Sequence, residues 1–408
     1  MLLVGIDWAE AEHAACLLAP SGAVLRRLRV PRSAAGLRRL RAAIAEEASA
    51  PAAVHVALER AHGLLVDALL EAGYTVYALN PKAVERDRHR TRTAGAKTDP
   101  ADAELLARIL LTDRERHRAL RPRSPQVEAI RALARDDERA SRDQRRRLNR
   151  LRQDLLAVFP QALSACPRLT EVSALAFLAE WPAAGAARGL GHEEIARFLR
   201  THQHGWPQRT AVRIHAALTA EALVAAPPVA AAKAGAIRLG AEQLLLLRRR
   251  RAAWREQLDD LLHAEEAQPD GAVRLRPPGA DARPAGRILG EIGADRGRFA
   301  TAGALRCDAG TAPVTKASGR SRVVAARFAC NRFLRQALLR WALCSLRVSA
   351  WARAFYDAKR AAGQTHDRAL RCLANRWLQI LHHLRRTGQR YDEAIHQRNR
   401  ARAVGVAA

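Results

Sequence analysis

The most constraining feature of this 408-residue chain is the alternation of short apolar runs and helical patterns over residues 1–80. Turn signals such as Pro20-Ser21-Gly22 and Asn80-Pro81 bound runs rich in β-branched residues. These runs predict strands at Leu2–Trp8, His13–Leu18, Val24–Val30, Ala53–Leu58 and Tyr74–Leu79. Two helices interrupt them: one is capped by Ser33 and carries Leu37, Leu40 and Ile44, and the other covers Gly63–Glu71.

The order of three strands, a helix, a strand, a helix and a strand is typical of a ribonuclease H-like sheet. We therefore expect an α/β domain over residues 1–122. From Ser124 onward, apolar residues recur at helical spacing between dense charges, which indicates a long helix or coiled coil, and a second such helix is expected at Ala241–His263. Further divisions are expected as a helical or coiled-coil region at 123–267, a mostly helical domain at 268–390 and a basic tail at 391–408.

The charge balance points to a polyanionic partner. Lys plus Arg is 69 and Asp plus Glu is 41, which gives a net charge of +28. Basic surface of this kind binds nucleic acid by releasing its counterions. Because 49% of the residues are hydrophobic, the chain is no disordered basic tail. Without a membrane-spanning run or a CxxC pair, the sequence favours a bacterial cytoplasmic protein associated with the nucleoid.

Four acidic residues follow strand ends or begin a helix. Asp7 ends the first strand within GIDWA, and Glu59 follows the fourth strand within VALER. Asp99 and Asp102 lie in KTDPADA, where Asp99 is expected as the N-cap of a helix. Clustered carboxylates repel one another unless cations neutralise them, and Mg²⁺ or Mn²⁺ prefer such oxygen ligands. The alternative interpretation is that Asp99 only caps a helix and Glu59 is a solvated strand end.

The stretch 276–299 has the pattern of a helix–hairpin–helix-like element. Pro278-Gly279 could form a hairpin whose backbone N–H groups contact phosphate, and the helix that follows would add the positive end of its dipole. An ordinary Pro/Gly loop between helices would show the same pattern.

A serine lies in a strongly basic segment, GTAPVTKASGRSRVVAAR. Ser318 precedes Gly319, and the cations around it are Lys316, Arg320, Arg322 and Arg327. Attack on phosphorus requires backbone freedom at the nucleophile and positive charge around the phosphorane. A lone Ser-Gly pair by itself indicates only a phosphate-binding loop, and Thr315 and Ser321 are rival hydroxyl groups.

Taken together, these stretches resemble the DEDD-type transposases of the insertion-sequence 110 group, which are bridge-RNA-guided recombinases. The resemblance rests on GIDWA, ALER at 57–60, NPKAVERDRHRTRTAGAKTDPADAELLARIL at 80–110, and PPG…ILGEIG…RF…AGTAP…SG further on. It implies a RuvC-like domain with a metal-binding tetrad of Asp7, Glu59, Asp99 and Asp102, and it implies Ser318 as nucleophile. Lys97 in the KTDPADA stretch would contact nucleic acid.

The resemblance also implies the partners. They are donor and target DNA, a non-coding bridge RNA and further copies of the chain, as a dimer or tetramer joined through the coiled coil. The acidic site of one subunit and the serine of another would form a composite site. The segment PPGADARPAG, with Asp281 beside the hairpin, departs from the family pattern. Two alternatives therefore stay open: a metal-dependent nuclease or junction resolvase that uses water, and an inactive RNA- or DNA-binding relative.

Overall fold

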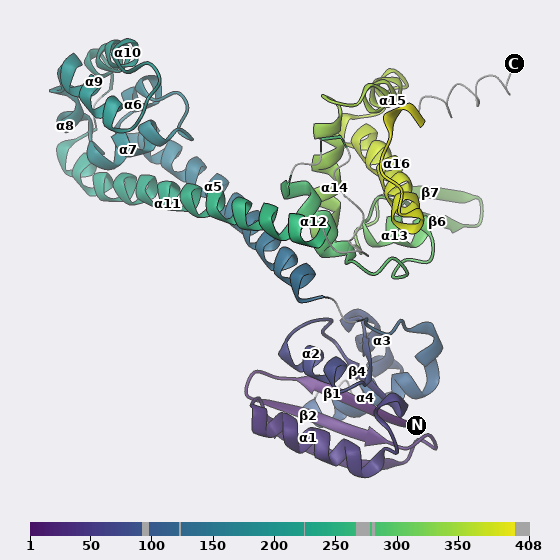
Figure 1. Ribbon diagram of the computed structural model, residues 1–408. Helices are drawn as coiled ribbons and strands as arrows, with labels where there is room; N and C mark the ends of the chain where they lie inside the picture. The colour runs from purple at the N-terminus through teal and green to yellow at the C-terminus, as the bar shows by residue number, and fades with distance from the viewer. Residues whose placement is uncertain (92–97, 122–123, 224, 267–277, 280–281, 396–408) are drawn as a thin grey trace, which may run out of the picture. The chain divides into compact units, whose positions relative to one another are not determined.

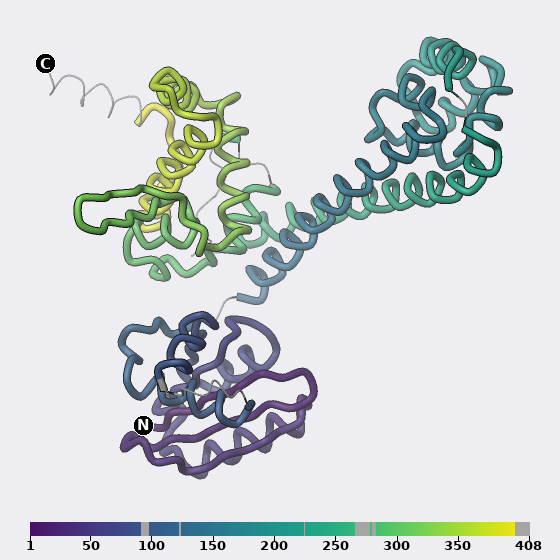
Figure 2. The backbone as a smooth tube through the Cα atoms, turned by 180° about the vertical axis from the view of Figure 1, so that it is seen from behind, coloured from purple at the N-terminus to yellow at the C-terminus, as the bar shows by residue number. Residues whose placement is uncertain are grey.

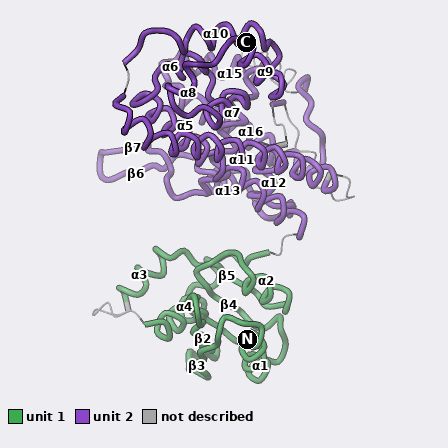
Figure 3. The backbone as a smooth tube through the Cα atoms, turned by 90° about the vertical axis from the view of Figure 1, so that its left-hand side faces the viewer, with its two compact units in different colours: residues 1–122 green, residues 123–408 purple. Residues whose placement is uncertain are grey.

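A computed structural model describes residues 1–91, 98–121, 124–223, 225–266, 278–279 and 282–395. The chain divides into two compact units, Met1–Pro122 and Arg123–Ala408, which Figure 3 shows in different colours. No helix in the described ranges is long and apolar enough to cross a membrane.

The first unit is built on a five-stranded mixed sheet. Its strands are β1 (Leu2–Trp8), β2 (Glu12–Leu18), β3 (Val24–Pro31), β4 (Val54–Leu58) and β5 (Thr75–Ala78). They lie in the order β3-β2-β1-β4-β5. The central strand β1 pairs antiparallel with β2 and parallel with β4. All five predicted strands are confirmed, with small shifts at their ends.

Helices cover both faces of this sheet (Figure 1). Even-numbered residues of β1, such as Val4 and Ile6, pack with α1 (Ala34–Glu47) and α2 (Leu64–Glu71). Odd-numbered residues face the other core, which contains α4 (Asp99–Asp113) and Val84 of α3 (Pro81–Thr91). The expected cap is present, because the Ser33 hydroxyl accepts a hydrogen bond from Gly36 N at 3.1 Å. The short 3-10 helices η1 (Pro51–Ala53) and η2 (Arg114–Arg116) complete the unit.

The start of α4 differs from the prediction. Thr98 occupies the N-cap position with extended backbone, and Asp99 is the first residue inside the helix. Pro100 suits this first turn because its missing N–H would have no partner there. The expectation that Asp99 caps the helix was therefore wrong by one residue.

Two long helices run side by side through the second unit (Figures 1 and 2): α5 (Pro125–Val158) and α11 (Pro227–Glu266). Ser124 caps α5, and Pro125 occupies its first turn. The predicted second helix began at Ala241, whereas α11 begins at Pro227. The long helices pack against each other within one chain.

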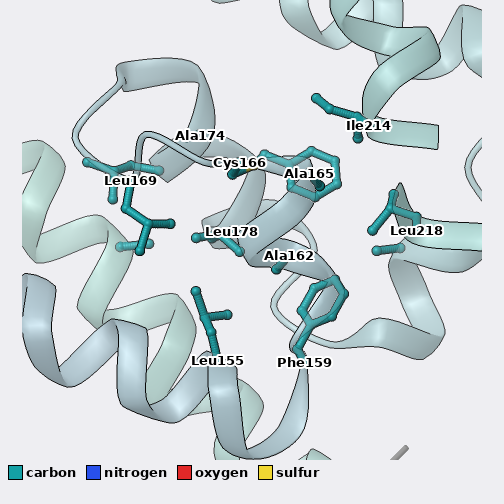
Figure 4. Close-up of a cluster of buried hydrophobic side chains, with 14 of the residues drawn as sticks. Leu155, Phe159, Ala162, Ala165, Cys166, Leu169, Ala174, Leu178, Ile214 and Leu218 are labelled. Carbon is teal, nitrogen blue, oxygen red and sulfur yellow. The ribbon is translucent and has the colours of Figure 1, made fainter. Parts of the chain in front are cut away.

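The ends of these two helices enter different hydrophobic cores. Leu151 and Leu155 of α5 pack with Ile237 and Leu244 of α11 against a small helical layer. This layer, part of which Figure 4 shows, consists of α6 (Gln161–Ala165), α7 (Val172–Glu180), α8 (Ala184–Arg188), α9 (His192–Thr201) and α10 (Pro207–Thr219). Toward the other end, Ile130 and Leu258 join the core of the C-terminal helices.

The C-terminal core surrounds three tryptophan rings. Trp377 lies 4.7 Å from Trp341 and 4.6 Å from Trp351 between ring centroids. The elements here are α12 (Ala282–Ile292), α13 (Ala302–Asp308), β6 (Val314–Ser318), β7 (Ser321–Ala325), α14 (Arg332–Ser345), α15 (Ala350–Ala361) and α16 (His366–Thr387). The apolar residues Leu338 and Trp341 of α14 and Leu373 and Leu381 of α16 line this core.

Two features of the C-terminal part were not expected. An antiparallel hairpin, β6–β7, replaces the predicted basic loop. The predicted tail begins in contact with the core: Tyr391 packs against it and accepts a hydrogen bond from Trp351 Nε1 at 2.6 Å. Burial and the neighbouring Glu393 carboxylate raise the pKa of Tyr391. Residues 396–408 of that tail lie outside the described residues.

Candidate active site

The register of the sheet places Asp7 beside Glu59. Gly5 of β1 is the partner of Ala57 of β4 in a parallel ladder, so two residues further along Asp7 comes opposite Glu59, which directly follows β4. Because side chains alternate across a strand, Asp7 shares the face of Gly5, and Glu59 shares the face of Ala57. Both carboxylates are partly buried. They therefore lie at the carboxyl edge of the sheet, on the face that α4 covers.

The close approach of α4 to β1 at Gly5 brings two more acids to this edge. A side chain at Gly5 would lie 2.6 Å from Ala107 N, and nearer still to Ala103 O, so only glycine allows this contact. Ala103 directly follows Asp102. Asp102 is 4% exposed and Asp99, one turn earlier, is exposed. The first turn of α4 thus presents a buried and an exposed carboxylate on the same side of the sheet as Asp7. We call Asp7, Glu59, Asp99 and Asp102 the acidic edge.

Asp102 is held by a cation of the protein itself. Arg88 Nε of α3 donates to Asp102 Oδ1 at 2.9 Å, and the two side chains are 14% and 5% exposed. In the described part of the chain, no three His, Cys, Asp or Glu side chains form a group that could hold a metal ion. The donor set of the acidic edge nevertheless consists of carboxylate oxygens, the ligand type that Mg²⁺ and Mn²⁺ prefer. Lys97 lies outside the described residues.

Ser318 lies at the turn of the exposed hairpin β6–β7. It is the last residue of β6 and pairs with Ser321, so Gly319 and Arg320 form a two-residue turn. Gly319 has a φ of +52°, and a side chain there would meet nothing within 4 Å. Glycine is therefore favoured at this position by the backbone conformation and not by packing. Both strands are exposed along most of their length.

The basic residues predicted around Ser318 divide into two groups. Lys316, Arg320 and Arg322 are exposed on the hairpin, where they form a positive ribbon around the serine. Arg327 is partly buried after the hairpin, and its backbone carbonyl accepts a hydrogen bond from Arg335 at 3.3 Å. The first group is accessible to a polyanion, whereas Arg327 is tied to α14.

Gly279 has a packing role in the structure. Its φ is +79°, and a side chain there would meet Ser345 N at 2.7 Å. The neighbouring Pro278 carbonyl accepts a hydrogen bond from Trp341 Nε1 at 3.1 Å. The turn therefore lies against the C-terminal end of α14, and its predicted contact with phosphate stays a prediction.

The second unit contains an arginine-rich cleft of about 340 Å³ that the sequence did not reveal. Residues of α5, α12 and α14 line it: Glu138, Ser141, Arg142, Arg145, Arg283, Arg287, Gln336 and Arg340. Behind it, Asp137, 3% exposed, accepts hydrogen bonds from Arg251 and Arg283 at 2.8 and 2.7 Å. Burial would raise the pKa of this carboxyl, but the two guanidinium groups outweigh burial and lower it. Five lining arginines against one lining carboxylate, that of Glu138, leave this cleft positive.

Neither Gly5 nor Arg88 was predicted as part of a site. The only signal for Gly5 was a glycine inside an apolar strand, which often marks a close approach of another backbone. Nothing local marks Arg88, because its partner Asp102 belongs to a different helix.

Comparison with known proteins gives matches along most of the chain. Residues 4–160 match a family model described as a transposase, of the DEDD type in the IS110 group, and residues 275–357 match the transposase IS116/IS110/IS902 family. The chain is 35% identical over 399 residues to the mini-circle transposase for IS117 of Streptomyces coelicolor, covering 95% of both chains. It is 29% identical over 303 residues to an insertion element IS110 protein of the same organism, covering 74% of this chain and 73% of that one. An insertion element IS900 protein of Mycobacterium paratuberculosis is 28% identical over 400 residues, with 92% and 94% covered.

Proposed function

Because this chain belongs to the IS110 family of transposases, we propose that it moves an insertion sequence by cutting and rejoining DNA strands with a divalent metal ion and a serine nucleophile. The observation that carries the proposal is the acidic edge. Two adjacent parallel strands and the first turn of α4 bring four carboxylates to one side of one sheet. Carboxylate oxygens are the ligands that Mg²⁺ and Mn²⁺ prefer.

Asp7, Glu59, Asp99 and Asp102 would hold the Mg²⁺ or Mn²⁺ ion. When bound, the ion would stabilise negative charge on the phosphate oxygens during phosphoryl transfer. Arg88 neutralises Asp102 in the structure, so we expect its guanidinium to release this carboxylate when the ion binds. Its guanidinium could then contact a phosphate of the DNA.

Ser318 would attack the DNA phosphate. Its Oγ–P bond would form as the P–O3′ bond breaks, leaving a 5′-phosphoserine link and a free 3′-hydroxyl group. The hydroxyl proton would pass to a base, and a proton would reach the leaving 3′ oxygen. Exposure at a hairpin turn gives Ser318 access to a strand, and Lys316 and Arg320 supply positive charge nearby. Because the serine belongs to the second unit, we expect it to meet the acidic edge in a composite site of a dimer or tetramer.

A non-coding bridge RNA would direct the enzyme to donor and target DNA. The support from this chain is its charge of +28 together with the arginine-rich cleft, which suits phosphate groups. Sequencing the RNA that copurifies with wild type and with Asp102→Ala tests this part. A discrete RNA from sequence flanking the gene, present with both proteins, is expected, and random cellular RNA alone would contradict a guide.

Hydrolysis by an activated water is the second candidate, because the acidic edge lies in a unit that does not contain Ser318. A nicked DNA substrate that traps covalent adducts separates the two. We expect a 5′-phosphoserine adduct with wild type and with Ser321→Ala, the matched control across the hairpin, but none with Ser318→Ala.

Each remaining result has a clear meaning. Cutting that persists in Ser318→Ala and is lost in Asp7→Ala would favour the water mechanism. Binding without cutting under any metal would indicate an inactive relative.

A further inference from the structure

A cavity of about 660 Å³ opens on the other face of the sheet from the acidic edge. It lies where β1 ends, between the start of α1 and the loop that leads from β4 into α2. Its lining includes Trp8, Arg32, Leu37, Arg60, Leu64 and Leu65. Trp8 and Arg60 are the residues that follow Asp7 and Glu59, so the cavity and the acidic edge are built on the same two strand ends.

Trp8 is the centre of this cavity. Its ring is partly exposed and lies 4.9 Å from the His13 ring between centroids. Two guanidinium groups approach the ring, with Arg32 at 5.6 Å and Arg60 at 5.4 Å from its centroid. Both guanidinium groups lie over the ring as cation–π partners, so a flat, electron-rich group that stacks on the indole would take their place there.

The two arginines retain their charge for a ligand. Nearby Arg26 and Arg27 of β3 pair with Glu46 and Glu104 at 2.7 Å. In contrast, Arg32 and Arg60 form no ion pair with any carboxylate of the described residues, and both are exposed. Burial, and then the charge of Arg32, lowers the pKa of His13, so this ring is neutral near pH 7. His13 therefore adds no charge to the cavity near pH 7, whereas the two guanidinium groups do.

The rest of the lining is apolar and open. Val30, Leu37 and Leu65 line it, and Leu64, in the first turn of α2, is 84% exposed. A large exposed apolar side chain beside a half-open indole ring indicates a surface that a ligand covers. The cavity thus combines an aromatic platform, apolar contact and two free cations, and its volume is within the range of small-molecule sites.

We propose that this cavity receives one unpaired base of the DNA strand, which stacks on Trp8 while Arg32 and Arg60 contact the flanking phosphates. A nucleotide has the matching chemistry, because its base has a flat apolar face and its phosphates are anionic. The assignment to DNA rests on the proposed function, since a strand cut at the acidic edge passes the end of β1. Holding the neighbouring base outside the duplex would fix the strand beside the carboxylates.

The test compares two DNA hairpins that differ by one unpaired base, so that general electrostatic binding cancels. The ratio of their dissociation constants is measured by fluorescence anisotropy with the full chain in EDTA, where no cutting occurs. Stacking of one base corresponds to about a 5- to 150-fold change in affinity. We expect wild type to prefer the hairpin with the unpaired base by at least about fivefold, and Trp8→Ala to bind both alike.

Three further variants separate the ligand contact from folding. Trp8→Phe retains an aromatic face and should keep most of the preference. Arg32→Gln/Arg60→Gln should reduce it, whereas Arg38→Gln/Arg41→Gln, with the same charge change on exposed positions of α1, should not. Trp206→Ala, at a ring that is 73% exposed in the second unit, is the control for loss of an indole group.

Two outcomes would overturn the proposal. One is an unchanged preference in Trp8→Ala. The other is a preference that depends on Trp8 with RNA hairpins of the same sequence but not with DNA, which would make the ligand RNA. Because the assay needs neither metal nor cutting, failure of the cleavage tests would leave this result standing, and the reverse is also true.

Discussion

Substitution of Gly5 by alanine should damage the acidic edge without changing any acidic residue. The new Cβ would lie 2.6 Å from Ala107 N, inside the 3.0 Å that real Cβ atoms keep, and nearer still to Ala103 O. Both obstacles are helix backbone, which cannot rotate away as a side chain can. Helix α4 would have to move outward by on the order of 1 Å, an overpacking that costs about 1–3 kcal/mol.

The functional effect follows from the place of the contact. Ala103 is adjacent to Asp102, so the same movement displaces the carboxylates of α4 from Asp7 and Glu59. A misplacement of about 1 Å in an active site lowers rates by up to about 100-fold. We expect Gly5→Ala to nick DNA about 10- to 100-fold more slowly in Mg²⁺ and to exchange the amide hydrogens of α4 faster.

The matched control is Gly235→Ala. Gly235 lies within α11, and a side chain there meets nothing within 4 Å. Alanine is the better helix former, so this variant should gain about 0.5–1 kcal/mol and keep its nicking rate. Wild-type exchange and wild-type nicking in Gly5→Ala would refute the argument that α4 positions the site through this contact.

The remaining predictions concern buried charges and thiols. Arg88→Ala leaves Asp102 as an unpaired buried carboxylate, so we expect the free energy of unfolding to fall by about 3 kcal/mol. Added Mg²⁺ should then raise the Tm of this variant more than it raises that of wild type. Equal Mg²⁺-dependent shifts in Tm would contradict the exchange of Arg88 for the ion. Burial opposes ionisation of Glu291, but hydrogen bonds from Arg135 and Asn331 outweigh it and lower its pKa. Its stabilisation should be complete above about pH 4.3, the unfolded value, and lost as the pH falls through the lower folded value. Urea midpoints should therefore fall less steeply with acid in Glu291→Gln; the same slope as in wild type would count against this carboxylate. Burial raises the pKa of Cys16 to about 11, so alkylating reagents should modify this thiol far more slowly at neutral pH than they modify the half-buried Cys372. A time course followed by mass spectrometry measures both rates, and equal rates would disprove the protection of Cys16.

Features that depend on neighbours in the sequence were predicted well. The Ser33 cap of α1 was predicted, because a cap needs only the next three residues, and the long helix expected from about Ser124 begins at Pro125. The five strands follow from turn residues and from apolar runs that bury both faces of the sheet. The hairpin β6–β7 was missed because both of its faces are exposed, so no alternation of polar and apolar residues marks it.

Features that depend on distant residues could not be read in the same way. The acidic edge was predicted from strand ends, but the contact at Gly5 and the pair Arg88–Asp102 depend on how α3 and α4 pack. The arginine-rich cleft is assembled from α5, α12 and α14, which are far apart in the chain. Asp99 was misplaced by one residue because Thr98 and Asp99 are both suitable caps, and only the backbone conformation decides between them.

The paired helices α5 and α11 give the second unit a fixed internal length. Each joins two separate cores, at Ile130 and Leu258 near one end and at Leu155 and Ile237 toward the other. An α-helix advances about 1.5 Å and turns about 100° per residue, so one residue inserted into both helices would rotate one core against the other by more than a quarter turn. Seven residues would return to within about 20° and lengthen the span by about 10 Å. The distance between the two cores can therefore change only by insertions that are close to whole numbers of helical turns in both helices.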